Sequence, residues 1–174
     1  MATLYLIRHG EPEQRGVFLG QMDPPLSVVG RMQAASSLEK IEVAIAYTSP
    51  LRRARETAEY VGSPQTVIME GLREIDFGEW TGKTWREIES GWSELARLKA
   101  ADWLGIAAPG GESWRQFLNR IETVWHAVRT GPAPAAVVGH QAVNAALAHL
   151  IDGMDPLVFE QQYGEVTLID YGNH

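Results

Sequence analysis

The most constraining feature of the sequence is an apolar run near its start that ends in charged residues. Four apolar residues, Leu4–Ile7, lead directly into Arg8, His9 and Gly10. A short apolar run bounded by a turn residue is typical of a strand buried on both faces of a parallel sheet. In open α/β sheets, ligands bind at the carboxyl ends of the strands. An Arg and a His at that edge therefore predict an anion site that contains a nucleophile or an acid–base group.

The rest of the chain alternates apolar runs with segments of helical pattern. Strands are predicted near residues 3–8, 43–48, 66–69, 135–138 and 165–171. Helices are predicted near residues 27–39, 50–60, 84–99, 114–130 and 141–152. This alternation favours an α/β fold, a three-layer α/β/α sandwich with a mostly parallel sheet. No repeat, low-complexity tract or linker divides the chain, so a single domain over residues 1–174 is expected.

Local start signals place two of the predicted helices. Ser49 followed by Pro50 is the pattern of an N-cap and a first helical residue. Thr84 and Glu87 have the spacing of a capping box, and Gly91 is expected to break or bend the helix that they begin. The helix after Pro50 follows a predicted strand directly, so it should begin at the carboxyl edge of the sheet.

Composition narrows the classes of function. The formal net charge is −7 and no stripe of Lys and Arg stands out, which argues against nucleic acid or an anionic membrane as a partner. The chain has no Cys, which excludes disulfides, a thiolate nucleophile and Cys-ligated zinc. Its start lacks the basic flank of a signal peptide and no run approaches a membrane span, so a cytoplasmic enzyme is expected. The motifs of P-loop, dinucleotide-binding, zinc-protease and serine-hydrolase sites are absent.

A second histidine follows another buried strand. His140 comes after the apolar run 135–138 and Gly139, much as His9 follows the first strand. If both strands lie in the middle of a parallel sheet, both imidazoles meet at one edge. Either histidine alone could be a hydrogen-bonded structural residue, but two at equivalent strand ends favour a functional site.

Arginines and a glutamate are further candidates. Arg52, Arg53 and Arg55 stand in the first turns of the helix after the second strand. A helix N-terminus favours anions and Arg adds paired donors suited to phosphate, although at least one of the three is expected on a solvated face. Glu74 could act as a general acid beside a phosphate, or could be a surface residue. Glu112 has a similar, weaker claim.

The loop over residues 11–26 lies beside the end of the first predicted strand. Phe18, Leu19 and Gly20 in this loop are placed to contact a substrate, or they pack on the surface. The six Trp residues are expected to serve packing rather than ligand stacking.

Six segments of the chain, in order, resemble the histidine phosphatase superfamily and within it the phosphoglycerate mutase-like group. They are Arg8-His9-Gly10-Glu11, Asp23–Ser27, Thr48–Ala54, Leu72–Gly82, Pro109–Ser113 and Val137–His140. The resemblance covers nearly the whole chain. It implies the phosphoglycerate mutase-like fold and phosphoryl chemistry with no metal and no other cofactor.

The resemblance also implies roles for the matching residues. His9 would attack the phosphorus of a small phosphomonoester and form a phosphohistidine. Arg8, Arg53 and His140 would bind the phosphoryl oxygens, and Glu74 would protonate the leaving oxygen and then activate water. Further contacts to the phosphate or the substrate are expected from Gly10, Gln141, Phe18, Leu19 and Gly20.

Several departures from the family pattern bear on the substrate. Gln141–Ala145 stand where the family usually has Gly residues followed by Arg, and Gln14-Arg15 replace the Trp-Asn pair typical of the mutases. The chain also lacks the long insertions of true phosphoglycerate mutases, so a phosphatase is favoured. Phe18-Leu19-Gly20 resemble the loop of the small phosphatases, including α-ribazole phosphatase-like members.

Two other functions stay open, together with the oligomeric state. The chain could be a 2,3-bisphosphoglycerate-dependent phosphoglycerate mutase, or a non-catalytic module that binds a phosphorylated ligand. The final predicted strand, near residues 165–171, could lie at a sheet edge and pair with a second copy, which would give a homodimer.

Overall fold

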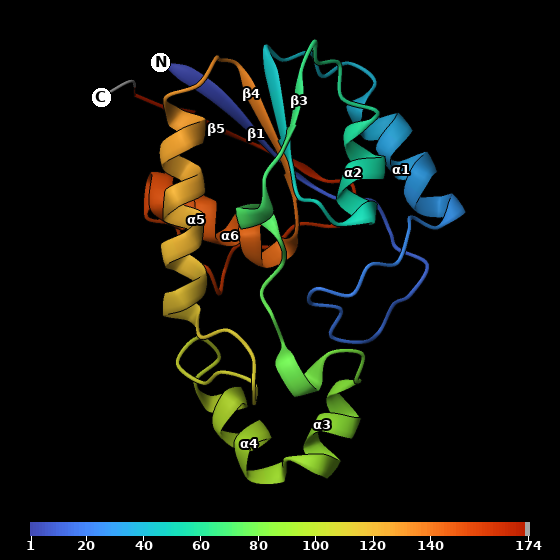
Figure 1. The fold of residues 1–174 in the computed structure, drawn as a ribbon, viewed down its shortest axis with the longest axis vertical. Helices are drawn as coiled ribbons and strands as arrows, with labels where there is room; N and C mark the ends of the chain where they lie inside the picture. The colour runs from blue at the N-terminus through green and yellow to red at the C-terminus, as the bar shows by residue number, and fades with distance from the viewer. Residues whose placement is uncertain (173–174) are drawn as a thin grey trace.

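The computed structural model describes residues 1–172, and a five-stranded sheet forms its centre (Figure 1). The strands are β1 (Ala2–Arg8), β2 (Ile45–Thr48), β3 (Thr66–Ile68), β4 (Ala135–Gly139) and β5 (Val166–Tyr171). They lie in the order β3-β2-β4-β1-β5, with β1 and β4 as parallel neighbours in the interior of the sheet. Of the five strands, only β5 runs antiparallel, and it pairs with β1 at the sheet edge. The prediction of an α/β fold with a mostly parallel sheet is confirmed.

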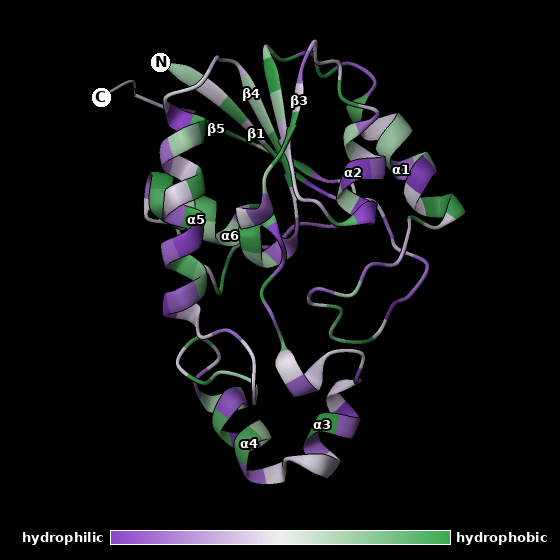
Figure 2. Cartoon of the chain, viewed as in Figure 1, coloured by the Kyte–Doolittle hydropathy of each residue, from purple (hydrophilic) through white to green (hydrophobic). Residues whose placement is uncertain are grey.

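Helices cover both faces of the sheet and make it the middle of three layers (Figure 1). They are α1 (Val28–Leu38) and α2 (Arg52–Ala58) on one face, and α5 (Trp114–Arg129) and α6 (Gln141–Asp152) on the other. Successive side chains of a strand point to opposite faces, so Ile7 packs in the α1–α2 cluster and Leu6 in the α5–α6 cluster. Figure 2 shows hydrophobic and hydrophilic residues alternating along α5, as expected of a helix with one buried face.

A smaller helical unit lies beyond the sheet, at the foot of the molecule in Figure 1. It contains α3 (Trp85–Gly91) and α4 (Ser93–Ala101). The capping box of Thr84 and Glu87 is confirmed, and α3 ends at Gly91, the residue predicted to interrupt it. The unit packs around a buried cluster of its own, formed by Trp80, Ile88, Ala96 and Ala108.

The start of α2 differs from the prediction. The helix begins at Arg52 rather than at Pro50, and its N-cap residue Leu51 makes no side-chain capping bond. The hydroxyl of Ser49 accepts a hydrogen bond from the Leu51 amide at 3.3 Å and lies 2.8 Å from a ring nitrogen of His140. Ser49 therefore serves the strand end and the histidine beside it instead of capping the helix.

Two glycines bring α1 against the turn that follows β1. A Cβ atom at Gly10 would overlap the backbone of Gly30, and a Cβ atom at Gly30 would overlap the backbone of Glu11. Only glycine at both positions permits this close approach of the two backbones. Within residues 1–172, no helix has the length and apolar character needed to cross a membrane.

Candidate active site

β1 and β4 each deliver one histidine to the same edge of the sheet. The register places Arg8 opposite Gly139, so that His9 and His140 follow directly on neighbouring strands. Their ring centroids are 5.1 Å apart in an edge-to-face arrangement, and both side chains are buried. The two imidazoles therefore share one buried site.

Hydrogen bonds define the tautomer of His9. Its Nδ1 lies 2.7 Å from the carbonyl oxygen of Gly10, and because a carbonyl can only accept, Nδ1 must carry the proton. Nε2 then accepts a hydrogen bond from Nε of Arg53 at 3.2 Å. Burial and the charges of Arg53 and Arg8 lower the pKa of His9 well below its ordinary value of 6.5. His9 is neutral near pH 7, with a lone pair on Nε2 as a nucleophile requires.

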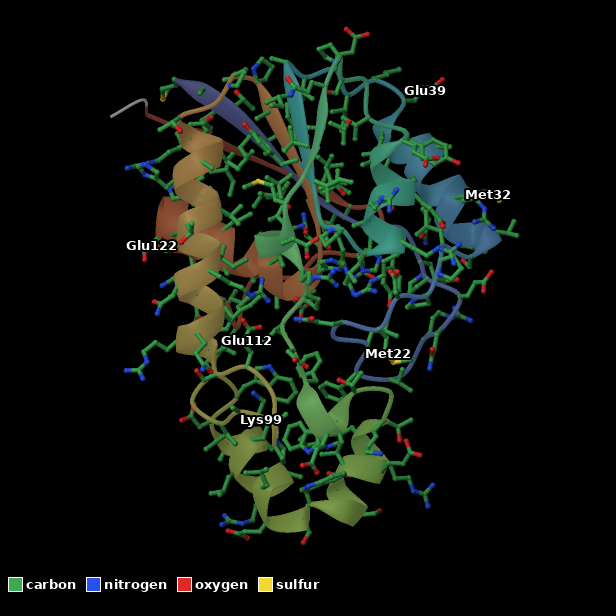
Figure 3. The ribbon with its side chains drawn as sticks, in the orientation of Figure 1. Met22, Met32, Glu39, Lys99, Glu112 and Glu122 are labelled. Atoms are coloured by element: carbon green, nitrogen blue, oxygen red, sulfur yellow. The ribbon has the colours of Figure 1, made fainter. Side chains whose placement is uncertain are left out.

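Arg53 is buried and connects the first loop to His9. Its Nη1 donates to the carbonyl of Met22 at 2.6 Å, and Nη2 donates to the carbonyl of Gly20 at 2.9 Å. Figure 3 shows Met22 on this loop, between the sheet and the smaller helical unit. Arg52 and Arg55 on the same helix are exposed, so only one of the three candidate arginines reaches the site.

Arg8 is held by a backbone carbonyl and an aromatic ring. Its Nη1 donates to the carbonyl of Gln161 at 2.5 Å, and its guanidinium carbon lies 4.3 Å from the centre of the Tyr163 ring. Its Nε is buried and has no hydrogen-bond partner among the described residues. Buried donors are rarely left unpaired, so this nitrogen suits a bound oxyanion.

The second histidine also has a hydrogen-bond partner on only one of its two ring nitrogens. Nε2 of His140 lies 2.8 Å from the hydroxyl oxygen of Ser49, whereas Nδ1 is buried without a partner among the described residues. Burial and the charges of Arg53 and Arg8 lower the pKa of His140 well below 6.5. A neutral imidazole here can donate one hydrogen bond from Nδ1 to an oxyanion while the Ser49 hydroxyl donates to Nε2.

Glu74 supplies a carboxyl group to the same site. Its Oε1 accepts from the Ile75 amide at 2.9 Å and its Oε2 accepts from the Ala142 amide at 3.3 Å. Burial raises the pKa of this carboxyl above its usual 4.5, although both amides and the charge of Arg53 oppose the shift. A carboxyl with a raised pKa keeps its proton to a higher pH and can give it to a leaving group.

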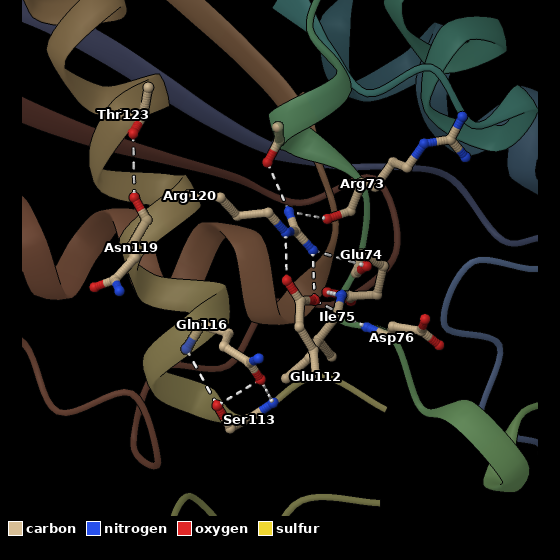
Figure 4. Close-up of polar contacts among 11 residues, drawn as sticks. Arg73, Glu74, Ile75, Asp76, Glu112, Ser113, Gln116, Asn119, Arg120 and Thr123 are labelled. Atoms are coloured by element: carbon tan, nitrogen blue, oxygen red, sulfur yellow. Dashed lines mark hydrogen bonds and ion pairs between the residues drawn. The ribbon is translucent and has the colours of Figure 1, made fainter. Parts of the chain in front are cut away.

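An ion pair behind Glu74 holds the segment that carries it (Figure 4). Nη1 of Arg120 donates to the carbonyl of Arg73 at 2.8 Å, and Nη2 donates to the carbonyl of Glu74 at 3.2 Å. The same guanidinium pairs with Glu112 at 2.7 Å, and Glu112 in turn accepts from the Asp76 amide. Glu112, a weaker candidate for the acid, therefore acts on the backbone around Glu74.

A buried amide network holds the carbonyl that receives Arg8. Nε2 of Gln161 donates to the carbonyl of Leu6 and to the hydroxyl of Thr167, both at 2.9 Å. Its Oε1 accepts from Nδ2 of Asn144 at 2.8 Å. Gln161 thereby joins β1, β5 and α6 and sets the position of Arg8.

Four of these side chains line a cavity of about 390 Å³, and His140 lies fully buried beside His9 without lining it. Its charged or imidazole-bearing lining residues are Arg8, His9, Arg53 and Glu74. Its other lining residues are Gly16, Val17, Phe18, Leu19, Gly20, Phe77, Trp85, Trp103, Gln141, Ala142 and Tyr163. The cavity is thus polar at the sheet edge and largely apolar where the first loop and the smaller helical unit enclose it.

The structure brings most of the predicted site residues to this cavity. Phe18, Leu19, Gly20 and Gln141 line it, whereas Gly10 is buried and contacts His9 through its carbonyl. Residues that sequence reasoning did not place in the site also contribute, among them Gln161, Tyr163, Trp85 and Trp103. The sequence predicts packing rather than ligand stacking for the Trp residues, and the structure places these two in the cavity wall.

Within residues 1–172, no three His, Asp or Glu side chains are grouped so that they could hold a metal ion. The anion-binding groups of the site are cationic side chains and N–H donors. This composition fits recognition of a phosphoryl group by side chains.

Comparisons with known proteins give a consistent result. The model of the histidine phosphatase superfamily (branch 1) matches residues 4–174. A protein of Hydrogenobacter thermophilus, whose name proposes phosphoserine phosphatase activity, is 32% identical over 88% of this chain and 80% of its own. A 2,3-bisphosphoglycerate-dependent phosphoglycerate mutase of Brucella abortus is 29% identical over 88% and 83%. The crystal structure of the α-ribazole phosphatase of Shigella flexneri superposes with a TM-score of 0.85 at 27% identity, covering 97% of this chain and 90% of that one.

Proposed function

Because the chain belongs to the histidine phosphatase superfamily (branch 1), we propose that it hydrolyses a small phosphomonoester through a phosphohistidine on His9, with residues 1–174 acting as one domain. The observation that carries this proposal is the state of His9. Its proton sits on Nδ1 toward the Gly10 carbonyl, and its Nε2 lone pair accepts from Nε of Arg53, a donor that can turn to a phosphoryl oxygen instead. A neutral imidazole held in this way is ready for attack on phosphorus.

In the first step, Nε2 of His9 attacks the phosphorus in line with the leaving oxygen. The new N–P bond forms as the P–O bond to the alcohol breaks, and protonated Glu74 gives its proton to that oxygen. Arg8, Arg53 and His140 donate hydrogen bonds to the three remaining oxygens, where negative charge spreads in the transition state. The proton on Nδ1 stays on the ring and remains hydrogen-bonded to the Gly10 carbonyl.

In the second step, water attacks the phosphohistidine. Glu74, now a carboxylate, takes a proton from the water as its oxygen bonds to phosphorus and the N–P bond breaks. Inorganic phosphate forms, Nε2 regains its lone pair, and Glu74 is again protonated for the next cycle. A general acid–base group of this kind contributes about 10²–10⁴-fold in rate.

The substrate is a small phosphorylated metabolite, and the likeness to the Shigella flexneri enzyme makes α-ribazole 5′-phosphate one candidate. The likeness to mutases leaves a second candidate reaction. Supplying 3-phosphoglycerate with the bisphosphate and looking for 2-phosphoglycerate separates a mutase from a phosphatase. A non-catalytic binding module would bind vanadate without turning over any ester.

The deciding experiment is hydrolysis of p-nitrophenyl phosphate in the presence of EDTA, with the wild type beside His9→Ala. We expect turnover that survives EDTA and is abolished in the variant, because the variant has no nucleophile to form the covalent intermediate. With a ³²P-labelled ester, labelled protein should be recovered after a rapid alkaline quench, which preserves the acid-labile N–P bond, from the wild type and not from the variant. Turnover that EDTA removes, or that His9→Ala retains, contradicts the mechanism.

A further inference from the structure

Part of the cavity has no task in phosphoryl transfer, and it is aromatic. Phe18, Trp85 and Trp103 come from the first loop and from the smaller helical unit, and their ring centroids lie 5.8 to 6.2 Å apart. We call these three residues the aromatic wall. Trp103 is 40% exposed and the other two are partly exposed, in contrast to the fully buried Trp80 beside them. The aromatic wall therefore presents ring surface to the cavity and is not a closed core.

Every charged residue of the cavity is already assigned. Arg8 and Arg53 bind the phosphoryl oxygens in the proposed mechanism, and Glu74 moves the proton. The remaining lining residues, His9 apart, carry no charge. A second anionic group on the substrate would thus find no cation on the cavity wall.

Three cations on the surrounding segments, Lys99, Arg73 and Arg120, are engaged elsewhere. Nζ of Lys99 donates to the carbonyls of Trp103 and Ile106. Arg73 pairs with Glu70 at 2.8 Å, and the guanidinium of Arg120 is held by its ion pair and three carbonyls. None of these groups can turn to the cavity without giving up its present partners.

An adjoining cavity leads to the same conclusion. It measures about 480 Å³ and shares Arg8, Trp103, Gln141 and Ala142 with the catalytic cavity. The one charged residue that it adds is Glu160. A substrate that extended in this direction would meet an acid, which would repel a carboxylate.

We propose that the aromatic wall binds an uncharged, flat apolar group on the alcohol half of the substrate, and that the cavity disfavours esters whose alcohol half carries a carboxylate. This inference rests on the proposed function and narrows its substrate class. Flat rings stack on Phe and Trp faces and leave water as they do so. A carboxylate at the same place would lose water and gain no cation. Phosphoserine and phosphoglycerate both carry a carboxylate, so this chain would differ from relatives with those substrates.

The position of the aromatic wall is set before a substrate arrives. Nζ of Lys99 lies 4.9 Å from the centre of the Trp103 ring, in addition to its bond to the Trp103 carbonyl. Phe18 packs edge-on against Phe77 at 4.9 Å between centroids. A ring binding to a prepositioned wall needs little reorganisation, which favours affinity.

The test uses phosphonates, which bind without being hydrolysed. Calorimetry would compare butylphosphonate, 4-phenylbutylphosphonate and 5-phosphonopentanoate on the wild-type protein. We expect the phenyl compound to bind at least about tenfold more tightly than butylphosphonate, and the carboxylate at least about tenfold more weakly. Equal affinities, or tighter binding of the carboxylate, would overturn the proposal.

Variants assign the gain to the aromatic wall. Trp103→Ala should remove most of the ratio between the phenylbutyl and butyl affinities, and Trp103→Arg should favour the carboxylate over the phenyl compound. Trp92→Ala is the matched control, because Trp92 lies between α3 and α4 but does not line the cavity. Thermal unfolding would verify that each variant is folded. Trp103→Leu is a second variant that removes the indole ring and would replace Trp103→Ala if that variant does not fold. A ratio that survives Trp103→Ala and Trp103→Leu, or that falls equally in Trp92→Ala, contradicts the assignment.

Failure of this inference is distinguishable from failure of the proposed function. Phosphonate binding needs no turnover, whereas the proposed function stands on p-nitrophenyl phosphate hydrolysis and its loss in His9→Ala. An enzyme that hydrolyses p-nitrophenyl phosphate but binds the three phosphonates equally would keep its mechanism and lose its aromatic subsite. Phosphocholine hydrolysed faster than 4-phenylbutyl phosphate would show a cage for cations instead, and would also overturn the inference.

Discussion

The two ends of the cavity are constructed in different ways. The phosphate end comprises Arg8, His9, Arg53, Glu74 and His140, and the other end is the aromatic wall. Arg8, His9 and His140 lie at or directly after strand ends, whereas Arg53 comes from α2 and Glu74 from the segment after β3. Hydrogen bonds to main-chain atoms or to a buried hydroxyl hold all five side chains. The aromatic wall comes from the first loop and the smaller helical unit, and ring contacts hold it.

This difference shows how one chain can combine a fixed reaction with an adaptable choice of substrate. Groups that stabilise a transition state must stay in place while charge moves, and the hydrogen bonds from the main chain provide that rigidity. Rings on a loop and a separate helical unit can be exchanged without disturbing the sheet. The relatives found for this chain carry names with different phosphorylated substrates, which agrees with this division.

The largest loss of activity is expected from a substitution of Arg53, and it should test whether the two ends of the cavity act separately. Arg53→Lys keeps a positive charge but loses the planar fork that joins the phosphoryl group to the Gly20 and Met22 carbonyls. We expect kcat/KM to fall by about 10³–10⁵-fold, by the same factor for butyl phosphate and 4-phenylbutyl phosphate. The exposed Arg55→Lys on the same helix is the control. A loss confined to the phenyl ester would place Arg53 with the aromatic wall.

Glu74 belongs to the phosphate end, and its variant should respond to the chemistry of the leaving group. Glu74→Gln cannot supply a proton, so kcat for butyl phosphate should fall by about 10²–10⁴-fold. The loss for p-nitrophenyl phosphate should be much smaller, because p-nitrophenolate leaves without protonation. Steady-state rates on both esters give the answer, with the exposed Glu70→Gln as the control. Equal losses on the two esters would remove Glu74 from the role of acid.

A smaller effect is expected at Gln161, which holds the phosphate end without touching substrate. Gln161→Leu leaves the Leu6 carbonyl, the Thr167 hydroxyl and the Asn144 amide without their partner. Each buried group left unpaired costs about 1–3 kcal/mol, which urea unfolding would measure. Because the carbonyl that holds Arg8 shifts, we also expect KM for every phosphate ester to rise by roughly tenfold. The exposed Gln162→Leu should leave both quantities close to wild type, and an unchanged KM in a destabilised Gln161→Leu would limit Gln161 to a structural role.

The smallest expected effect concerns pH and stability. Burial lowers the pKa values of His9 and His140 in the folded state. Below about pH 6.5 these two histidines are therefore protonated in the unfolded chain but stay neutral in the folded chain. The free energy of unfolding should therefore be fully retained above pH 6.5 and fall as the pH is lowered from there. Urea unfolding at pH 7.5 and 5.5 should show a smaller fall for the double variant His9→Gln and His140→Gln. An equal fall would show that other groups dominate.

The same pH range should leave the aromatic wall unaffected. Its three rings do not titrate, and the ammonium of Lys99 that holds Trp103 stays largely charged below its lowered pKa of about 8. The ratio of the phenylbutyl to butyl phosphonate affinities should therefore be constant from pH 5.5 to 7.5, while both affinities change. A ratio that changes with pH would couple the two ends of the cavity.

Much of the fold and part of the phosphate end could be predicted because their signals are local. An apolar run that stops at a histidine marks a strand end, and two such runs predicted His9 and His140 at equivalent strand ends; the structure adds that these strands are neighbours. The local sequence pattern does not show which of Arg52, Arg53 and Arg55 faces the site, because that depends on which face of α2 is buried. Arg53 could be chosen as the phosphate ligand only through the resemblance to the family.

The residues that sequence reasoning missed are placed by long-range contacts. Gln161 and Tyr163 lie in a segment with no helical or strand period, and the amide of Gly164 in that segment donates to the carbonyls of Arg8 and His9 at 3.1 Å. Ser49 had the right pattern for a helix cap, but the ring of His140 competes for its hydroxyl. The local sequence around Trp85 and Trp103 does not distinguish them from buried Trp residues, and only the tertiary arrangement shows that they face a cavity.

The contact between Gly10 and Gly30 has a consequence for engineering this protein. Any side chain at either position would force α1 away from the turn that carries His9. A mutant library meant to alter substrate preference should therefore leave both codons unchanged and randomise Phe18, Trp85 and Trp103. Those three positions line the cavity, whereas the two glycines set a limit on how far α1 and the first loop can be redesigned.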